Sequence, residues 1–290
     1  REEDQQSFPL KAAGLKLWSL RQGNLYRGQV LLFDRAGNEL DRTAPVTFGI
    51  REFWTQGRNV FLNGEQVRFM MDGDYHKYRS MDEAFAAGIT LVPGRTWNSE
   101  HMLCNYESML RDCDRLGMAA TTNGVTTRYL DLSDPETLRA YRRWAVEHIR
   151  KLRNHPSLWL WGIDYNIGMG PNSFWPTELG RGEFTFWGNT NVSLGSLIHR
   201  EIDPTRDTYV HGGIIAPGIP SCNIYLNHVP LQEAEEWPSE WAEKGDRHFL
   251  AIEYMGSVLE QDFQKNMRSY VTEYAARLHG DRAYREEPDE

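Results

Sequence analysis

The sequence lacks a long apolar run. No stretch of its 290 residues approaches the roughly 20 consecutive apolar residues that a helix needs to cross a bilayer. Residues 1–7 also lack the apolar segment of a signal peptide, so we expect either a cytoplasmic protein or a chain whose true start lies further upstream. The sequence predicts no membrane partner and leaves the compartment open.

Basic charge and cysteine are also scarce. There are 32 Lys and Arg against 41 Asp and Glu, a net charge of -9, and nucleic acid as a partner needs a basic face instead. The three cysteines, Cys104, Cys113 and Cys222, are odd in number and lack metal-ligand spacing. We therefore expect no disulfide framework, no zinc site and no nucleic-acid partner.

Aromatic residues, in contrast, are plentiful: 10 Trp, 13 Tyr and 12 Phe. Trp rings fill cores, and their faces also make good platforms for sugars. Trp187 and Trp237 lie among Gly, Asn, Pro and Glu, which favours exposure. We therefore take them as candidate sugar-binding residues.

The chain divides near residue 50. Residues 25–50 predict a β-hairpin whose turn is RAGNE, so residues 1–50 are interpreted as the C-terminal strands of an immunoglobulin-like β-sandwich, or as a hairpin docked on the next domain. Over residues 51–290, seven short apolar runs alternate with amphipathic helical stretches, which favours an α/β fold with a parallel sheet. The runs are 67–71, 89–92, 118–122, 157–163, 208–214, 222–227 and 248–254.

Seven such strands favour a (β/α)8 TIM barrel whose eighth strand is not evident in this chain. A doubly wound sheet is the alternative, but no Gly-rich phosphate loop follows any strand. Active sites of such barrels lie at the carboxyl ends of the strands. The residues at these ends are Asp74, His76, Arg95, Trp97, Asn98, Asn123, Asp164, Tyr165, Asn166, His211, Tyr225, Asn227 and Glu253.

This set is rich in carboxylates, amides and aromatics, which suits the many hydroxyl groups of a sugar. Glu253 is the sharpest candidate because it ends the apolar run HFLAIEY, where an unpaired carboxylate would be costly. It is either a nucleophile or base, or a structural acid paired with Arg95.

Five motifs, in order along nearly the whole chain, resemble glycoside hydrolase family 2, which includes β-galactosidases, β-glucuronidases and β-mannosidases. They are VTFGIREFWTQGRNVFLNGEQVRF, LRDCDRLGMA, RNHPSLWLWG, IHREIDPTRDTYV and LAIEYMG. The resemblance implies a carbohydrate substrate, a retaining mechanism with Glu253 as nucleophile, and no cofactor. It also implies supporting or sugar-contacting roles for Arg95, Trp97, Asn98, His211 and Asn227.

The sequence departs from the family at the end of residues 157–166. The family has its acid/base Glu five positions after the Trp that matches Trp161, and Asn166 stands there. An amide cannot donate a proton as a carboxylic acid does. Asp164 is one candidate replacement, Glu178 or Glu183 from the long loop 168–191 is another, and a site without an efficient acid is the third.

Two functions follow from this pattern. The first is a retaining exo-β-glycosidase that hydrolyses terminal sugars of glycosides or polysaccharide fragments through a covalent glycosyl-enzyme on Glu253. The second is a catalytically impaired carbohydrate-binding barrel, and either is compatible with a truncated piece of a larger glycosidase. Homo-oligomerisation is left open.

Overall fold

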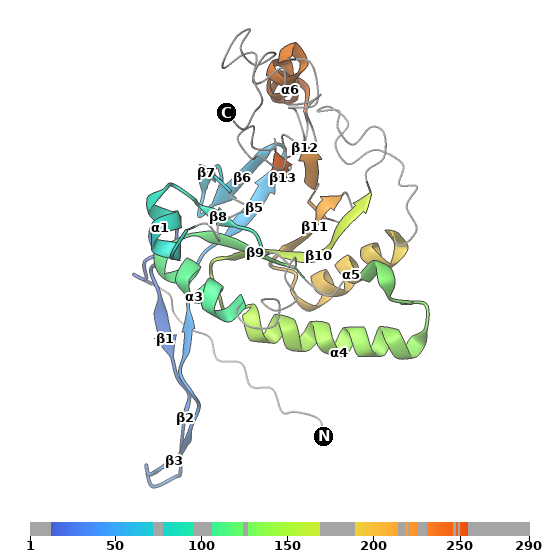
Figure 1. The fold of residues 1–290 in the computed structure, drawn as a ribbon. Coiled ribbons are helices and arrows are strands. Elements are labelled where there is room, and N and C mark those ends of the chain that lie inside the picture. The colour runs from blue at the N-terminus through green and yellow to red at the C-terminus, as the bar shows by residue number, and fades with distance from the viewer. Residues whose placement is uncertain are drawn as a thin grey trace.

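The protein is an α/β molecule built on parallel strands, with an antiparallel ribbon at its N-terminal side (Figure 1). The computed structural model describes residues 13–71, 78–94, 106–123, 127–168, 189–213, 218–219, 221–224, 231–245, 248 and 250–254.

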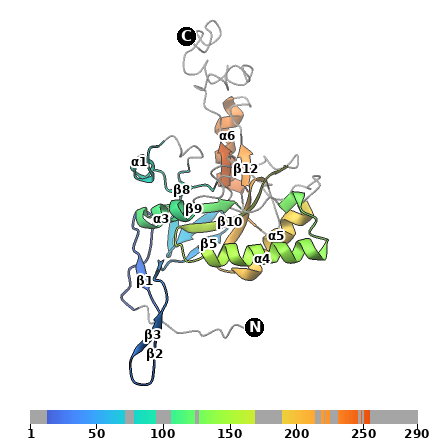
Figure 2. The same ribbon diagram turned by 60° about the horizontal axis from the view of Figure 1, so that its bottom comes forward.

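The predicted hairpin at residues 25–50 is confirmed. Strands β1 (Tyr26–Gly28) and β4 (Val46–Phe48) pair antiparallel, and β2 (Leu31–Phe33) pairs with β3 (Glu39–Arg42) further along the same ribbon. The turn is closed by the Asp34 carboxylate, whose Oδ1 accepts hydrogen bonds from the backbone N–H groups of Ala36 and Asn38 at 2.8 Å each. Figure 2 shows the ribbon extending away from the rest of the molecule.

A three-stranded antiparallel meander follows the ribbon. It consists of β5 (Phe53–Gln56), β6 (Asn59–Leu62) and β7 (Glu65–Val67). At the second turn Asn63 and Gly64 have φ values of 54° and 90°, as the tight hairpin turn between β6 and β7 requires. These strands lie in a stretch where no such meander was predicted.

The parallel strands follow the meander. The sheet has the order β11 (Asp207–Gly213), β10 (Leu158–Gly168), β9 (Ala119–Asn123) and β8 (Leu91–Val92). Met71 adds a parallel bridge to Leu91 at one side, and Ile219 adds one to Tyr209 at the other. A second parallel pair, β12 (Ser221–Ile224) and β13 (Leu250–Tyr254), contacts β11.

From residue 78 onward, the predicted alternation of strands and helices is confirmed over the described residues. The predicted first strand at 67–71 is not: Val67 ends the antiparallel strand β7, and Met71 makes an isolated parallel bridge to Leu91. The helices are α1 (Met81–Ala86), α3 (Tyr106–Leu116), α4 (Pro135–Leu152), α5 (Asn189–Ile202) and α6 (Leu231–Lys244), with a short 3-10 helix, η2 (Thr127–Tyr129). The amphipathic stretch at residues 262–280 lies outside the described residues. An α/β fold with parallel strands is therefore present.

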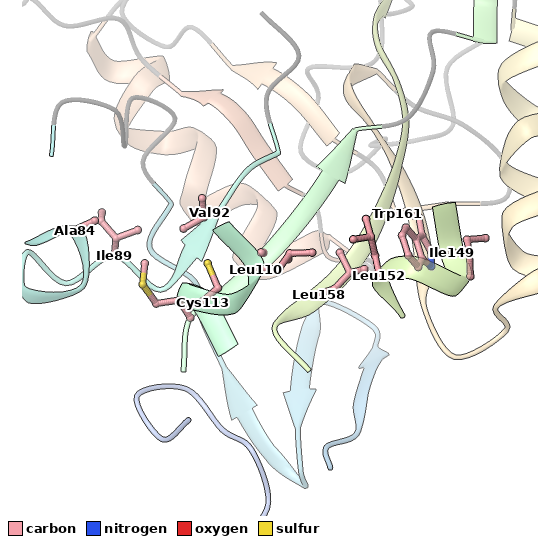
Figure 3. Close-up of a cluster of buried hydrophobic side chains, with 11 residues drawn as sticks. Ala84, Ile89, Val92, Leu110, Cys113, Ile149, Leu152, Leu158 and Trp161 are labelled. Atoms are coloured by element: carbon pink, nitrogen blue, oxygen red, sulfur yellow. The ribbon is translucent and has the colours of Figure 1, made fainter. Parts of the chain in front are cut away.

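The two faces of the sheet are covered differently. One face packs on helices, and Figure 3 shows this cluster, which includes Leu110 and Cys113 of α3, Ile149 and Leu152 of α4, and Leu158 and Trp161 of β10. The buried residues of the other face come from strands and the Ile219 bridge: Val60, Leu91, Ala119, Trp159, Leu160, Tyr209, Ile219 and Leu250.

The meander packs near the amino ends of the parallel strands. Phe53 and Phe69 lie with ring centroids 5.9 and 4.5 Å from that of Trp159, the second residue of β10. The opposite edge of the sheet, where the parallel strands end, therefore remains for a functional site.

The segment before the ribbon is docked on the α/β part. Trp18 is fully buried, and its indole Nε1–H donates to the carbonyl of Asp114 in α3 at 2.8 Å. Its backbone N–H donates to Ile50 O at 2.8 Å. Residues before position 50 thus contribute to the core of the α/β part as well as to the ribbon.

Candidate active site

The predicted site residues of three adjacent strands come from one edge of the sheet. Because β9, β10 and β11 are parallel, their carboxyl ends share an edge of the sheet. The β10–β11 register pairs Tyr165 directly with His211, whereas Asn123 lies opposite Gly162, four residues before Asn166. That these side chains form one site stays a prediction.

Glu253 lies near the carboxyl end of β13. Its register partner on β12 is Asn223, and an irregularity in the pairing falls between Cys222 and Asn223. The backbone of β13 is described, whereas the side chain of Glu253 lies outside the described part of the structure. The sequence also predicted Glu253 near the end of a strand, at residues 248–254.

β10 is longer than the sequence indicated. The predicted run ended at Ile163, but the strand continues to Gly168 because β11 pairs with it as far as Gly213. β9 pairs with β10 as far as Asn123, opposite Gly162, and residues 124–126 lie outside the described part of the chain. A register shift against β11 lies between Gly162 and Asp164.

The Asp164 side chain turns toward η2. Its Oδ2 accepts hydrogen bonds from Thr127 Oγ1 at 3.1 Å and from the backbone N–H of Arg128 at 2.8 Å. Arg128 Nε lies 3.8 Å from Oδ1, and the side chain of Asp164 has 0% exposure. Burial, and then the nearby Asp164 carboxylate, raise the pKa of Tyr141.

Two buried polar side chains lie on the strand-lined face of the sheet. The hydroxyl groups of Thr121 and Tyr209 are 2.7 Å apart and share a hydrogen bond. Thr121 Oγ1 also accepts from the backbone N–H of Gly94 at 3.1 Å, which links β9 to the residues after β8. His211, two residues after Tyr209, is 2% exposed. The hydrogen bond between these hydroxyl groups links β9 to β11 on this face of the sheet, two residues before His211.

Most of the predicted sugar-contacting side chains lie outside the described part of the chain. Trp237 is in α6, and Asn166 is in β10, but the side chains of both lie outside the described residues. The same is true of the whole of Asp74, His76, Arg95, Trp97, Asn98, Trp187, Tyr225 and Asn227, and of the loop candidates Glu178 and Glu183. Their roles stay predictions.

Sequence reasoning missed Thr127 and Arg128. They follow β9 and contact Asp164, which is 36 residues or more further along the chain. No spacing rule connects positions so far apart, so a composition or periodicity signal could not have found the pair. Among the described residues, no group of three or more His, Cys, Asp or Glu side chains is placed to hold a metal ion.

Comparison with known proteins connects this arrangement to carbohydrate enzymes. No family model matches the chain. Over 225 residues, 72% of this chain, the sequence is 25% identical to a β-galactosidase of Pectobacterium atrosepticum. The fold is similar to that of a Ruminococcus gnavus β-glucuronidase in complex with uronic deoxynojirimycin, with a TM-score of 0.60, 16% identity and coverage of 89% of this chain and 50% of that one. A family 2 β-galacturonidase of Eisenbergiella tayi bound to galacturonate gives a TM-score of 0.53 at 19% identity, covering 84% of this chain and 45% of that one.

The chain is related to glycoside hydrolase family 2.

The relationship covers only part of these relatives. The chain spans 20% of the length of the β-galactosidase and between 29% and 50% of the solved chains. None of the helices in the described part of the chain is long and apolar enough to cross a membrane. The family relationship agrees with the resemblance that the five motifs indicated.

Proposed function

We propose that the chain carries the catalytic part of a retaining β-glycosidase that removes terminal sugars through a covalent glycosyl-enzyme on Glu253. The position of Glu253 at the carboxyl end of a strand, in a chain related to family 2, is the observation that carries this proposal. In a retaining reaction, a carboxylate attacks the anomeric carbon and water then releases the sugar with its original configuration.

The wider fold proposed for this chemistry is a (β/α)8 barrel over residues 51–290. Support comes from the two faces of the sheet, since helices pack on one and the other is lined by strand residues, as in the interior of a barrel. For residues 1–50 we propose the last strands of an immunoglobulin-like sandwich. In the ribbon, Leu32 and Phe33 are 58% and 52% exposed, which suits strands that complete a larger sheet.

The source of the proton is the unusual part of the proposed mechanism. Asp164 was a candidate acid, but its carboxylate is buried and accepts two hydrogen bonds, whereas a general acid must reach the leaving oxygen. Those contacts weigh against Asp164 and favour either a loop carboxylate or a site without an efficient acid. Substrates with good leaving groups are then the natural first choice for measuring activity.

Azide rescue of a Glu253 variant tests the proposal. The Glu253→Ala variant leaves room beside the anomeric carbon, so azide attacks that face of a dinitrophenyl β-glycoside in one displacement and gives the α-glycosyl azide. The panel consists of galactosides, glucuronides, galacturonides and mannosides. Glu65→Ala, in the antiparallel meander, serves as the control and should keep wild-type turnover without forming the azide. Equal turnover by wild type and Glu253→Ala would refute the assignment.

A second candidate function is carbohydrate binding without efficient hydrolysis. It is favoured by the amide of Asn166 at the family's acid/base position together with the buried state of Asp164. Calorimetric titration with the free sugars corresponding to the glycoside panel distinguishes it: binding of a sugar without turnover of its dinitrophenyl glycoside is the expected result for this candidate.

A further inference from the structure

We infer that Asp164 is a positioning residue: its carboxylate ties the carboxyl-terminal half of β10 to η2 and so holds the strand residues that follow it. The kinetic part of this inference rests on the proposed glycosidase function, whereas the structural part can be tested without it. It assigns Asp164 a role other than proton donation.

The tie joins β10 to the segment that follows β9 in the chain. Among the described residues, β9 pairs with β10 as far as Gly162, and η2 contacts β10. The Asp164 Oδ2 atom accepts from the side chain of Thr127 and from the backbone of Arg128, the first two residues of η2. A carboxylate that receives hydrogen bonds at the start of a helical turn satisfies donors that the turn itself leaves without partners.

η2 is itself held by α5. Asn191 Nδ2 donates to the carbonyl of Leu130, directly after η2, at 2.5 Å. Leu130 N in turn donates to Thr127 O at 3.0 Å, which closes the turn. Asp164 is therefore bonded to a turn anchored to the helix layer, and the tie can transmit that rigidity to β10.

The tie lies where β10 is irregular. The pairing with β11 shifts between Gly162 and Asp164, and it shifts again between Tyr165 and Gly168. Such bulges re-aim the side chains that follow them and are frequent beside active sites. Asp164 lies between the two shifts, so its bonds to η2 anchor β10 where its pairing with β11 is irregular.

The contacts of Asp164 are those of a buried structural acid. Its side chain has 0% exposure and that of Arg128 has 8%, with 3.8 Å between Arg128 Nε and Asp164 Oδ1. Burial of a carboxylate costs little stability when hydrogen bonds satisfy its oxygens, as those from Thr127 and Arg128 do here. Proton donation to a glycosidic oxygen would require these bonds to break in every cycle.

The test compares Asp164→Ala and Asp164→Asn with Asp114→Ala. Asp114 is the matched control because it ties the amino end of the same strand: its Oδ1 accepts from the backbone N–H of Ser157 at 3.0 Å, and its side chain is 4% exposed. Thr127→Val removes one hydrogen-bond donor to Asp164 without changing side-chain shape. It replaces Asp164→Ala in the test if that variant does not fold. All variants are assayed well below their melting temperatures.

Turnover is measured with dinitrophenyl and unsubstituted phenyl β-glycosides. A positioning role predicts that Asp164→Ala lowers kcat by about 10²-fold on both, because displaced site residues slow every step that needs them. Asn keeps one acceptor oxygen for Arg128 N, so Asp164→Asn should recover most of this loss, and Asp114→Ala should keep the wild-type kcat. Loss confined to the phenyl glycosides, without rescue by Asn, would overturn the inference and identify Asp164 as the acid.

If the wild type hydrolyses no glycoside, that result refutes the proposed function alone. Amide hydrogen exchange then still tests the structural part of the inference. Asp164→Ala should speed amide exchange in both 127–130 and 164–168, whereas Asp114→Ala should leave these segments unchanged. Unchanged exchange in Asp164→Ala would overturn the positioning role.

Discussion

Acid should destabilise the fold through a buried histidine cluster between α4 and α5. His199 has no exposed surface, and its Nδ1 lies 3.0 Å from the carbonyl of Gly195. Its ring lies 6.0 Å from that of Trp144 and 6.2 Å from that of Trp161. His148 stacks on Trp144 at 4.8 Å. An imidazolium ion in this apolar layer would lose most of its hydration.

The pKa values give the size and sign of the effect. Burial is the main cause that lowers the pKa of His199 to about 4, and burial with the neighbouring His199 and Lys151 lowers that of His148 to about 4. The unfolded chain takes up its protons near pH 6.5, before the folded chain does, so stability is complete above that pH and falls as the pH drops toward 4. At pH 5, linkage gives a loss of roughly 2 kcal/mol for each histidine.

Urea unfolding followed by tryptophan fluorescence at pH 7, 6 and 5 measures this loss. His199→Phe keeps an aromatic ring among Tyr141, Trp144 and Trp161 but cannot take up a proton. The variant should lose roughly half of the wild-type change in unfolding free energy between pH 7 and pH 5. An identical pH dependence in the variant and the wild type would refute the reasoning.

Two further substitutions probe packing and backbone geometry. Leu158→Ala should cost about 2–5 kcal/mol of unfolding free energy in a urea titration, because Leu158 is fully buried in the cluster between β10 and the helices. A loss below about 1 kcal/mol would mean that the cluster can collapse around the gap. Gly117→Ala should cost more than about 1 kcal/mol by the same assay, since φ is 72° and a Cβ atom would lie 2.4 Å from the backbone N of Gln22; an unchanged midpoint would contradict this close approach.

The alternation of apolar runs and amphipathic stretches was enough to predict the main parallel strands and the described helices. Periodicity is a local property, and α4 has a clear signal: Asp134 caps its start by accepting from Thr137 N, Pro135 is its first residue, and one face is apolar. The meander was missed although its Asn63-Gly64 pair is a strong local sign of a hairpin.

The environment of Asp164 could not be predicted. From the sequence it looked like a polar residue closing a buried strand, and therefore like a group facing substrate. The structure turns it toward Thr127 and Arg128 of η2, 37 and 36 residues earlier in the chain. The residues of β10 do not encode contacts over such a distance in sequence.

The central claim is that Glu253 is a live nucleophile, and mass spectrometry of the intact protein tests it most directly. The protein is incubated with 2-deoxy-2-fluoro β-glycosides carrying dinitrophenolate, which departs without acid assistance, so the unusual residue at position 166 does not obscure the result. We expect one sugar to add a single glycosyl mass, and peptide mapping to place it on Glu253. Folded protein that forms no adduct with any sugar of the panel, or an adduct on another residue, would contradict the account.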